Sequence, residues 1–137
     1  MDGITIPLLH IAEPTAHAIK AARLNKVALL GTLPVMSTPF MIDEFERRGM
    51  QIIVPDYDEQ AYIDRIIFEE MSKGIFSDEA RARYLEIIDK LERRGAQGII
   101  LGCTEIPFLI KQEQRPQLPM FDTLRLHAEA AANAALA

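Results

Sequence analysis

The chain has 137 residues, 49% of them hydrophobic and 26% charged, proportions typical of a single soluble globular domain. This composition excludes a collagen-like chain, a disulfide scaffold and a disordered tail. The net charge of −5 at pH 7 disfavours nonspecific binding to nucleic acid or anionic lipid, so we expect partners of neither kind.

The cysteine content and the apolar runs bear on where the protein works. One cysteine cannot form an internal disulfide, and an unpaired thiol suits a reducing compartment. No apolar run approaches the roughly 20 residues that span a bilayer. Residues 1–4 do not show the basic and apolar regions of a signal peptide. We therefore expect a cytoplasmic protein that does not bind a membrane.

Five short apolar runs predict the strands. In chain order they are residues 6–9, 27–30, 51–54, 99–101 and 119–121. Each run lacks polar alternation, which is typical of strands buried on both faces in a parallel sheet covered by helices. Helical patterns separate the runs, over residues 13–23, 59–73 and 123–137 and after Thr38 and Ser77. The order βαβαβααβαβ predicts an α/β fold with an open parallel sheet flanked by helices.

The predicted helices carry recognisable ends and apolar faces. Thr38 and Ser77 are typical N-caps, and Gly49 and Gly95 each follow a pair of arginines, where a left-handed cap ends a helix. We expect the inward-facing residues to be Ile63, Ile66, Ile67, Phe68 and Met71 in one helix and Ala80, Tyr84, Ile87, Ile88 and Leu91 in another. The aromatic residues expected in the core are Phe68, Tyr84, Phe108 and Phe121.

Two predicted strands end in similar loops. Gly31-Thr32 follows the strand 27–30, and Gly102-Cys103-Thr104-Glu105 follows the strand 99–101. In open α/β sheets, ligands bind beyond the carboxyl ends of the strands. Each glycine permits close backbone approach, and the threonine hydroxyls and exposed amides suit a carboxylate or phosphate. The loops lack the Gly-Lys-Ser/Thr of a P-loop and the GxGxxG of dinucleotide-binding proteins.

Cys103 is the principal candidate for chemistry, although a lone cysteine is often a small buried apolar residue. A helix that begins near Pro107 would place backbone amides beside the thiol and favour the thiolate, whereas Glu105 would oppose it. His10 follows the first predicted strand and is a second candidate acid–base group. No spacing of His, Cys, Asp and Glu resembles a zinc site, so we expect no metal.

Several motifs stand in a characteristic order along the chain. They are Ile6–Ala12, Leu29–Thr32, Ile66–Glu70, Gly74–Phe76, Gly102–Pro107, Phe121–Thr123 and His127–Glu129. Together they resemble the aspartate/glutamate racemase family, and most closely its aspartate racemase branch, over essentially the whole chain. Glutamate racemases usually have His where this chain has Glu105.

The resemblance implies racemisation of aspartate or glutamate without a cofactor, by two bases that act on opposite faces of the substrate Cα. Cys103 matches the base of the family's second half. The residues that the resemblance places at substrate-binding positions are Gly31, Thr32, Lys73, Thr104 and Glu105. Of these, Lys73 lies near a family position that contacts the side-chain carboxylate of the substrate.

The family also carries a first half, with a glycine-rich loop and an Asn-Thr segment that holds the other base, and this chain resembles only the C-terminal part. Two interpretations follow: a racemase in which His10 or a second chain supplies the other base, and an incomplete racemase that binds small carboxylates or oligomerises. Hydantoin racemases, maleate isomerases and arylmalonate decarboxylases share the architecture, which leaves other substrates open.

The missing half also bears on domain organisation. We expect residues 27–117 to form an autonomous core, and residues 1–26 and 118–137 to belong to the first-half sheet of the full-length family. Without that half, these ends would leave strand edges and apolar faces exposed, so we expect a homo-oligomer.

Overall fold

The computed structural model describes residues 8–136 of the chain. Its strands are β1 (Lys26–Leu30), β2 (Gln51–Ile53), β3 (Ile99–Leu101) and β4 (Met120–Asp122). Its helices are α1 (Leu8–Ala21), α2 (Leu33–Ser37), α3 (Pro39–Glu46), α4 (Tyr57–Glu69), α5 (Asp78–Arg93), α6 (Ile106–Leu109) and α7 (Thr123–Leu136). Short 3-10 helices cover Met71–Lys73 and Gln112–Gln114.

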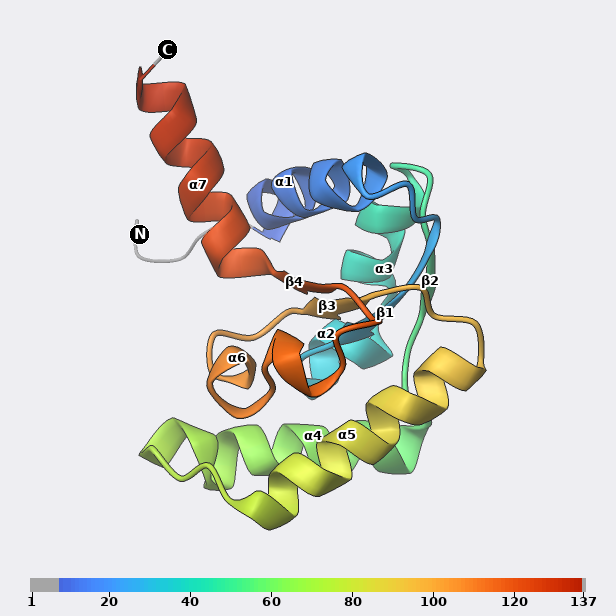
Figure 1. Cartoon of the computed structure of the whole chain (residues 1–137), viewed down its shortest axis with the longest axis vertical. Coiled ribbons are helices and arrows are strands. Elements are labelled where there is room, and N and C mark those ends of the chain that lie inside the picture. The colour runs from blue at the N-terminus through green and yellow to red at the C-terminus, as the bar shows by residue number, and fades with distance from the viewer. Residues whose placement is uncertain (1–7, 137) are drawn as a thin grey trace.

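The strands form one parallel sheet in the spatial order β2-β1-β3-β4 (Figure 1). In its register, Val27 lies beside Ile52, Leu29 beside Ile100, and Ile100 beside Phe121. Parallel neighbours need crossover connections, which the intervening helices supply. The predicted α/β fold with an open parallel sheet flanked by helices is confirmed.

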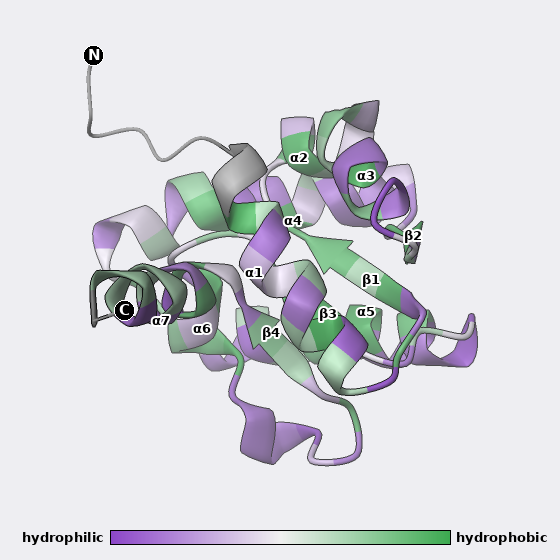
Figure 2. Cartoon of the chain, turned by 90° about the horizontal axis from the view of Figure 1, so that it is seen from above, coloured by the Kyte–Doolittle hydropathy of each residue, from purple (hydrophilic) through white to green (hydrophobic). Residues whose placement is uncertain are grey.

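Two layers of helices bury both faces of the strands. Val27 and Leu29 pack in one apolar cluster with α1 and α3, while Ala28 and Leu30 pack in another with α2, α4 and α5. Figure 1 shows α1 and α3 on one side of the sheet and α4 and α5 on the other. In Figure 2 the hydrophobic strands β1 and β3 lie inside, and hydrophilic residues gather on the outer helices and loops. Because each strand face meets a helical layer, the strand sequences lack polar alternation.

Predicted helix ends are found in the structure. The Ala80 amide donates to Ser77 Oγ at 3.0 Å, which caps α5. Thr38 stands at the predicted N-cap position before Pro39, the first residue of α3, but its hydroxyl donates to the Pro34 carbonyl at 2.6 Å and does not cap the helix. Gly49 and Gly95 have φ of 94° and 106°, the left-handed conformation that favours glycine at a helix end. The apolar stripe predicted for α5 is also confirmed, because its five residues are all buried: Ala80, Tyr84, Ile87, Ile88 and Leu91.

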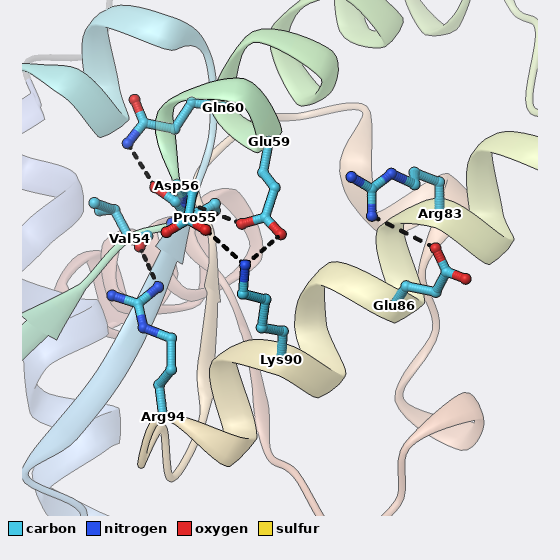
Figure 3. A network of polar contacts seen from close by, with 9 residues as sticks. All are labelled: Val54, Pro55, Asp56, Glu59, Gln60, Arg83, Glu86, Lys90 and Arg94. Carbon is cyan, nitrogen blue, oxygen red and sulfur yellow. Dashed lines mark hydrogen bonds and ion pairs between the residues drawn. The ribbon is translucent and has the colours of Figure 1, made fainter.

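A polar network joins the start of α4 to α5 (Figure 3). Lys90 Nζ of α5 lies 2.6 Å from Asp56 Oδ2 and 3.4 Å from Glu59 Oε2. The Glu59 carboxylate also accepts from the Asp56 amide at 2.9 Å, and Arg94 donates to the Val54 carbonyl at 2.8 Å. The network holds the entry to α4, just beyond β2, against the neighbouring helix.

The first expected strand, residues 6–9, is wrong where the structure describes it. Leu8 and Leu9 begin α1, and the rest of the run lies outside the described residues. A four-residue apolar run does not by itself distinguish a strand from a helix. Further along α1, Ala12 and Ile19 are both buried, and their seven-residue spacing places them on one face of a helix.

Two aromatic residues expected in the core are exposed. Phe68 is 57% exposed and Phe108 is 64% exposed. Phe68 follows the buried Ile66 and Ile67, and the turn of about 100° per residue carries it off the apolar face of α4. Phe108 instead packs on the loop before α5, with its ring centre 5.9 Å from that of Phe76.

The helix expected over residues 59–73 is divided in two. Helix α4 ends at Glu69, and a 3-10 helix follows over Met71–Lys73. Gly74 then takes φ of 81°, which ends the segment at the predicted place.

Both ends of the described chain lie against this one sheet. Strand β4 pairs with β3, α1 packs on β1, and α7 extends beyond the sheet (Figure 1). The assignment of residues 1–26 and 118–137 to another half in longer family members stays a prediction, as does the autonomy of residues 27–117. Among the described helices, none has the length and apolar character needed to cross a membrane.

Candidate functional site

The loops after β1 and β3 meet at the carboxyl edge of the sheet. From β1 the chain crosses to β2 on one side, and from β3 it crosses to β4 on the other, so a topological switch point lies between β1 and β3. The Gly102 amide donates to the Leu30 carbonyl at 2.8 Å, and a Cβ on Gly102 would lie 2.8 Å from that oxygen. A Cβ on Gly31 would lie 3.6 Å from the Gly102 carbonyl oxygen. Gly102 therefore allows the second loop to lie close to the end of β1, whereas the tight contact of a Cβ on Gly31 would be with Val35 of α2, at 3.0 Å.

Cys103 and its two successors form a hydrogen-bonded cluster in the second loop. The Cys103 thiol donates to Glu105 Oε1 at 3.0 Å, and the Thr104 hydroxyl donates to the same oxygen at 2.9 Å. Cys103 is half-buried and packs against the apolar cluster formed with α4 and α5, while Thr104 is exposed. Helix α6 begins directly after Glu105, so the carboxylate stands at its start.

The surroundings of Cys103 stabilise its neutral form. Burial, followed by the hydrogen bond to the Glu105 carboxylate, raises the pKa of the Cys103 thiol to about 11. The same thiol hydrogen bond, together with that of Thr104, lowers the pKa of the Glu105 carboxyl below its ordinary value. The helix-start amides of Glu105 and Ile106 favour the thiolate as expected, and the Glu105 carboxylate opposes it as expected, but burial together with the carboxylate outweighs the amides.

The first loop is held by a residue that the sequence analysis missed. Thr32 precedes α2, and the amide of the next residue, Leu33, donates to Asp64 Oδ1 of α4 at 2.7 Å. Asp64 lies beside the buried Ile63 on the predicted helix 59–73. A carboxylate next to an inward-facing stripe is the signal that could have identified it, since a half-buried carboxylate needs a hydrogen-bond donor.

The structure places the two remaining candidates elsewhere. His10 lies in α1, so its expected position at a strand end is wrong. Lys73 is exposed at the end of a 3-10 helix, and the segment that follows reaches α6 through the contact between Phe76 and Phe108. The part of Lys73 in substrate binding stays a prediction.

Two grooves differ in their relation to these loops. A groove of 490 Å³ opens beside Thr104, between α6 and the start of α7, and its lining includes Phe108, Lys111 and Arg125. A groove of 650 Å³ lies between α1 and α7, away from Cys103, and its lining includes His17. We take the first groove as part of the site because it shares Thr104 with the Cys103 loop. Within residues 8–136, no three His, Cys, Asp or Glu side chains are grouped to hold a metal ion.

Comparison with known proteins identifies the family. The sequence model of the Asp/Glu/hydantoin racemases matches residues 2–131. The chain belongs to this family. An uncharacterised protein of Pectobacterium carotovorum subsp. carotovorum is 30% identical over 108 residues, which are 79% of this chain and 71% of that protein.

Solved structures of the family have the same fold. A Yersinia pestis protein proposed to be an Asp/Glu racemase is 43% identical, with a TM-score of 0.89 over 94% of this chain and 56% of its own. An aspartate racemase homologue of Pyrococcus horikoshii OT3 is 33% identical, with a TM-score of 0.85 over 93% of this chain and 55% of its own. The chain therefore spans about half the length of the solved structures that it matches.

Proposed function

We propose that this racemase-family chain exchanges the α-proton of aspartate or glutamate, with Cys103 as the acid–base group on one face of the substrate Cα. The observation that carries the proposal is that Cys103 and Thr104 belong to the loop that follows β3 at the switch point, where the backbone of Gly102 meets the end of β1 just before the Gly31-Thr32 loop. Ligands of open α/β sheets bind at such points.

The protonated state of Cys103 suits the step in which a proton is delivered to the substrate Cα. With a pKa of about 11, the group is a thiol at neutral pH and can donate its proton to a planar carbanion. The hydrogen bond to Glu105 fixes the direction of the S–H bond before the substrate binds. Proton removal needs the thiolate instead, and a substrate ammonium group close to the sulfur would favour that form by Coulomb attraction.

Substrate binding would rest on the two adjacent loops. Thr32 and Thr104 carry hydroxyls that can donate to a substrate carboxylate, and Thr104 would exchange its bond to Glu105 for one to the substrate. Lys73 is proposed for the side-chain carboxylate on the resemblance alone. The reaction needs no cofactor in this scheme, because the proton moves only between Cα and protein groups.

Racemisation by two bases also needs a group on the opposite face of Cα. His10 or a group from a second chain would have to supply it. A second proposal is that the chain acts as an incomplete racemase, which binds small carboxylates or oligomerises without completing the two-base reaction.

Exchange of the α-proton in D2O tests the first proposal. L-aspartate and L-glutamate are incubated with the wild-type chain and with Cys103→Ser, and deuterium incorporation and chirality are followed by NMR and chiral chromatography. Glu113→Gln, which changes an exposed acidic residue of the 3-10 helix Gln112–Gln114, serves as the control. Exchange that Cys103→Ser abolishes and Glu113→Gln retains would support the proposal.

The stereochemical outcome separates the two proposals. Exchange with racemisation requires a second base in the chain or its oligomer, whereas exchange with retention indicates that Cys103 serves one face alone. Folded protein that exchanges no α-proton would overturn the first proposal. Binding of aspartate without exchange, seen as amide shifts at Gly31 and Gly102, would then support the incomplete racemase.

A further inference from the structure

Asp64 of α4 bonds to Leu33, which directly follows the candidate substrate loop Gly31-Thr32 and lies 31 positions earlier in the sequence. Its Oδ1 accepts the Leu33 amide hydrogen at 2.7 Å. We propose that Asp64 is a positioning residue, which holds the Gly31-Thr32 loop against the Cys103 loop. The inference deepens the proposed function and depends on it for its catalytic consequence.

The hydrogen bond acts at the point where the loop becomes a helix. Leu33 is the first residue of α2, and the first amides of a helix have no partner within it. A carboxylate makes a short, charge-assisted bond to such an amide. Since Leu33 directly follows Thr32, this bond restrains the backbone that carries the Thr32 hydroxyl.

Asp64 is itself held in place by the packing of its helix. The carbonyl of Ile63, its neighbour in α4, accepts a hydrogen bond from the Tyr84 hydroxyl at 2.8 Å. Ile63 and Tyr84 are both fully buried, and Lys90 ties the start of α4 to α5. The carboxylate is therefore a fixed point, and the loop is the element that it restrains.

The restraint reaches the Cys103 loop through the two glycines. Gly31 lies one residue before Thr32, and a Cβ added to Gly31 would lie 3.6 Å from the Gly102 carbonyl oxygen. Gly102 in turn precedes Cys103. Loss of the bond between Asp64 and Leu33 would free the backbone at Thr32 to move relative to the Cys103 loop, although the Gly102 amide would still bond to the Leu30 carbonyl.

Two substitutions of Asp64 test whether its side chain acts as a hydrogen-bond acceptor for the loop or only fills space. Asp64→Asn keeps an oxygen acceptor and the side-chain volume, while Asp64→Ala removes the acceptor. Asp58→Ala changes an exposed carboxylate of the same helix and is the matched control. The melting temperature of each variant is measured first, so that only folded proteins are compared with the wild type.

Amide NMR of the full chain gives the first readout. We expect Asp64→Ala to speed hydrogen exchange of the Leu33 amide about tenfold, the loss of roughly one net hydrogen bond. The amides of Gly31 and Gly102 should shift in the same variant, whereas Asp64→Asn and Asp58→Ala should stay close to wild type. Unchanged Gly31 and Gly102 amides in Asp64→Ala, or an Asn variant that behaves like the Ala variant, would overturn the proposal.

Kinetics of α-proton exchange give the second readout. Asp64→Ala should raise the KM for L-aspartate about tenfold with a smaller change in kcat, because a misplaced loop weakens binding before it alters proton transfer. Asp64→Asn should largely restore the KM. A wild-type chain that exchanges no α-proton would count against the proposed function only, since the amide measurements decide the role of Asp64 without catalysis.

Discussion

Cys103 donates its thiol hydrogen to Oε1 of Glu105 at 3.0 Å, only two residues along the chain. The bond holds the sulfur and the carboxylate together at the start of α6, and it stabilises the thiol relative to the thiolate. Because thiolates, not thiols, accept protons, the protonation of Cys103 is the property that this pair controls.

Glu105→Gln should lower the pKa of the Cys103 thiol from about 11, because the neutral amide removes the carboxylate that opposes a second negative charge. Burial of Cys103 remains and should keep the pKa above that of an exposed cysteine. Thiolate absorbance during a pH titration measures the change, with each titration taken as a difference from the corresponding Cys103→Ser protein so that the absorbance of the three tyrosines cancels. Glu113→Gln is the control, and an unchanged or higher Cys103 pKa in Glu105→Gln would contradict the assignment.

Cys103 should also make the free energy of unfolding depend on pH. Its pKa is about 8.5 in an unfolded chain and about 11 in the fold, so the folded state favours the neutral thiol. The stabilisation is fully present below about pH 8.5 and is lost as the pH rises through 11. Its size should be about 1–2 kcal/mol, after allowance for the partial exposure of the residue.

Urea unfolding of the wild type and Cys103→Ala between pH 7 and 11 measures this contribution. The difference between the two proteins isolates Cys103 from other groups that titrate at high pH, such as Tyr84, whose pKa burial raises. The free energy of unfolding of the wild type, relative to that of Cys103→Ala, should fall as the pH rises. A difference that stays constant with pH would show that the thiol is not stabilised as proposed.

Tyr84→Phe should lower the free energy of unfolding by about 1 kcal/mol, because it removes the buried bond from the hydroxyl to the Ile63 carbonyl. Tyr57→Phe, at a side chain that is 68% exposed, should change it by less than about 0.5 kcal/mol. Urea titration of both variants makes the comparison. Equal effects at the two positions would mean that the buried hydroxyl contributes nothing.

Gly102→Ala should destabilise the protein by about 1–3 kcal/mol, because its Cβ would lie 2.8 Å from the Leu30 carbonyl oxygen and force the backbones apart. The same variant should lose α-proton exchange, since the Cys103 loop then moves away from Gly31. Urea unfolding and the exchange assay measure the two effects. A stable variant with wild-type exchange would show that close approach of the loops is not required.

The sheet could be predicted from the sequence because its signals are local. Runs such as Val27–Leu30 and Ile99–Leu101 lack polar residues on either face, and Ser77 and Gly95 mark helix ends without reference to the rest of the chain. The run at Leu8-Leu9 carries the same apolar signal but lies in α1. The composition of a four-residue apolar run does not distinguish a strand from a helix.

The candidate site was predictable only in part. Motif and strand order were enough to bring the loops of Gly31 and Gly102 to one edge. The hydrogen bond from Leu33 to Asp64 depends on how α4 packs, which spacing along the chain does not reveal. The raised pKa of Cys103 likewise follows from burial and from the direction of the Glu105 side chain, which together outweigh the helix-start amides that lower it.

The most direct test of the account is whether an acidic amino acid binds against Cys103. Iodoacetamide modifies the single cysteine, and mass spectrometry follows the rate with and without saturating L-aspartate. We expect L-aspartate to slow the modification, L-lysine to leave the rate unchanged, and Thr32→Val to lose the protection by L-aspartate. An unchanged rate in folded wild-type protein would contradict an amino-acid site at the meeting of these two loops.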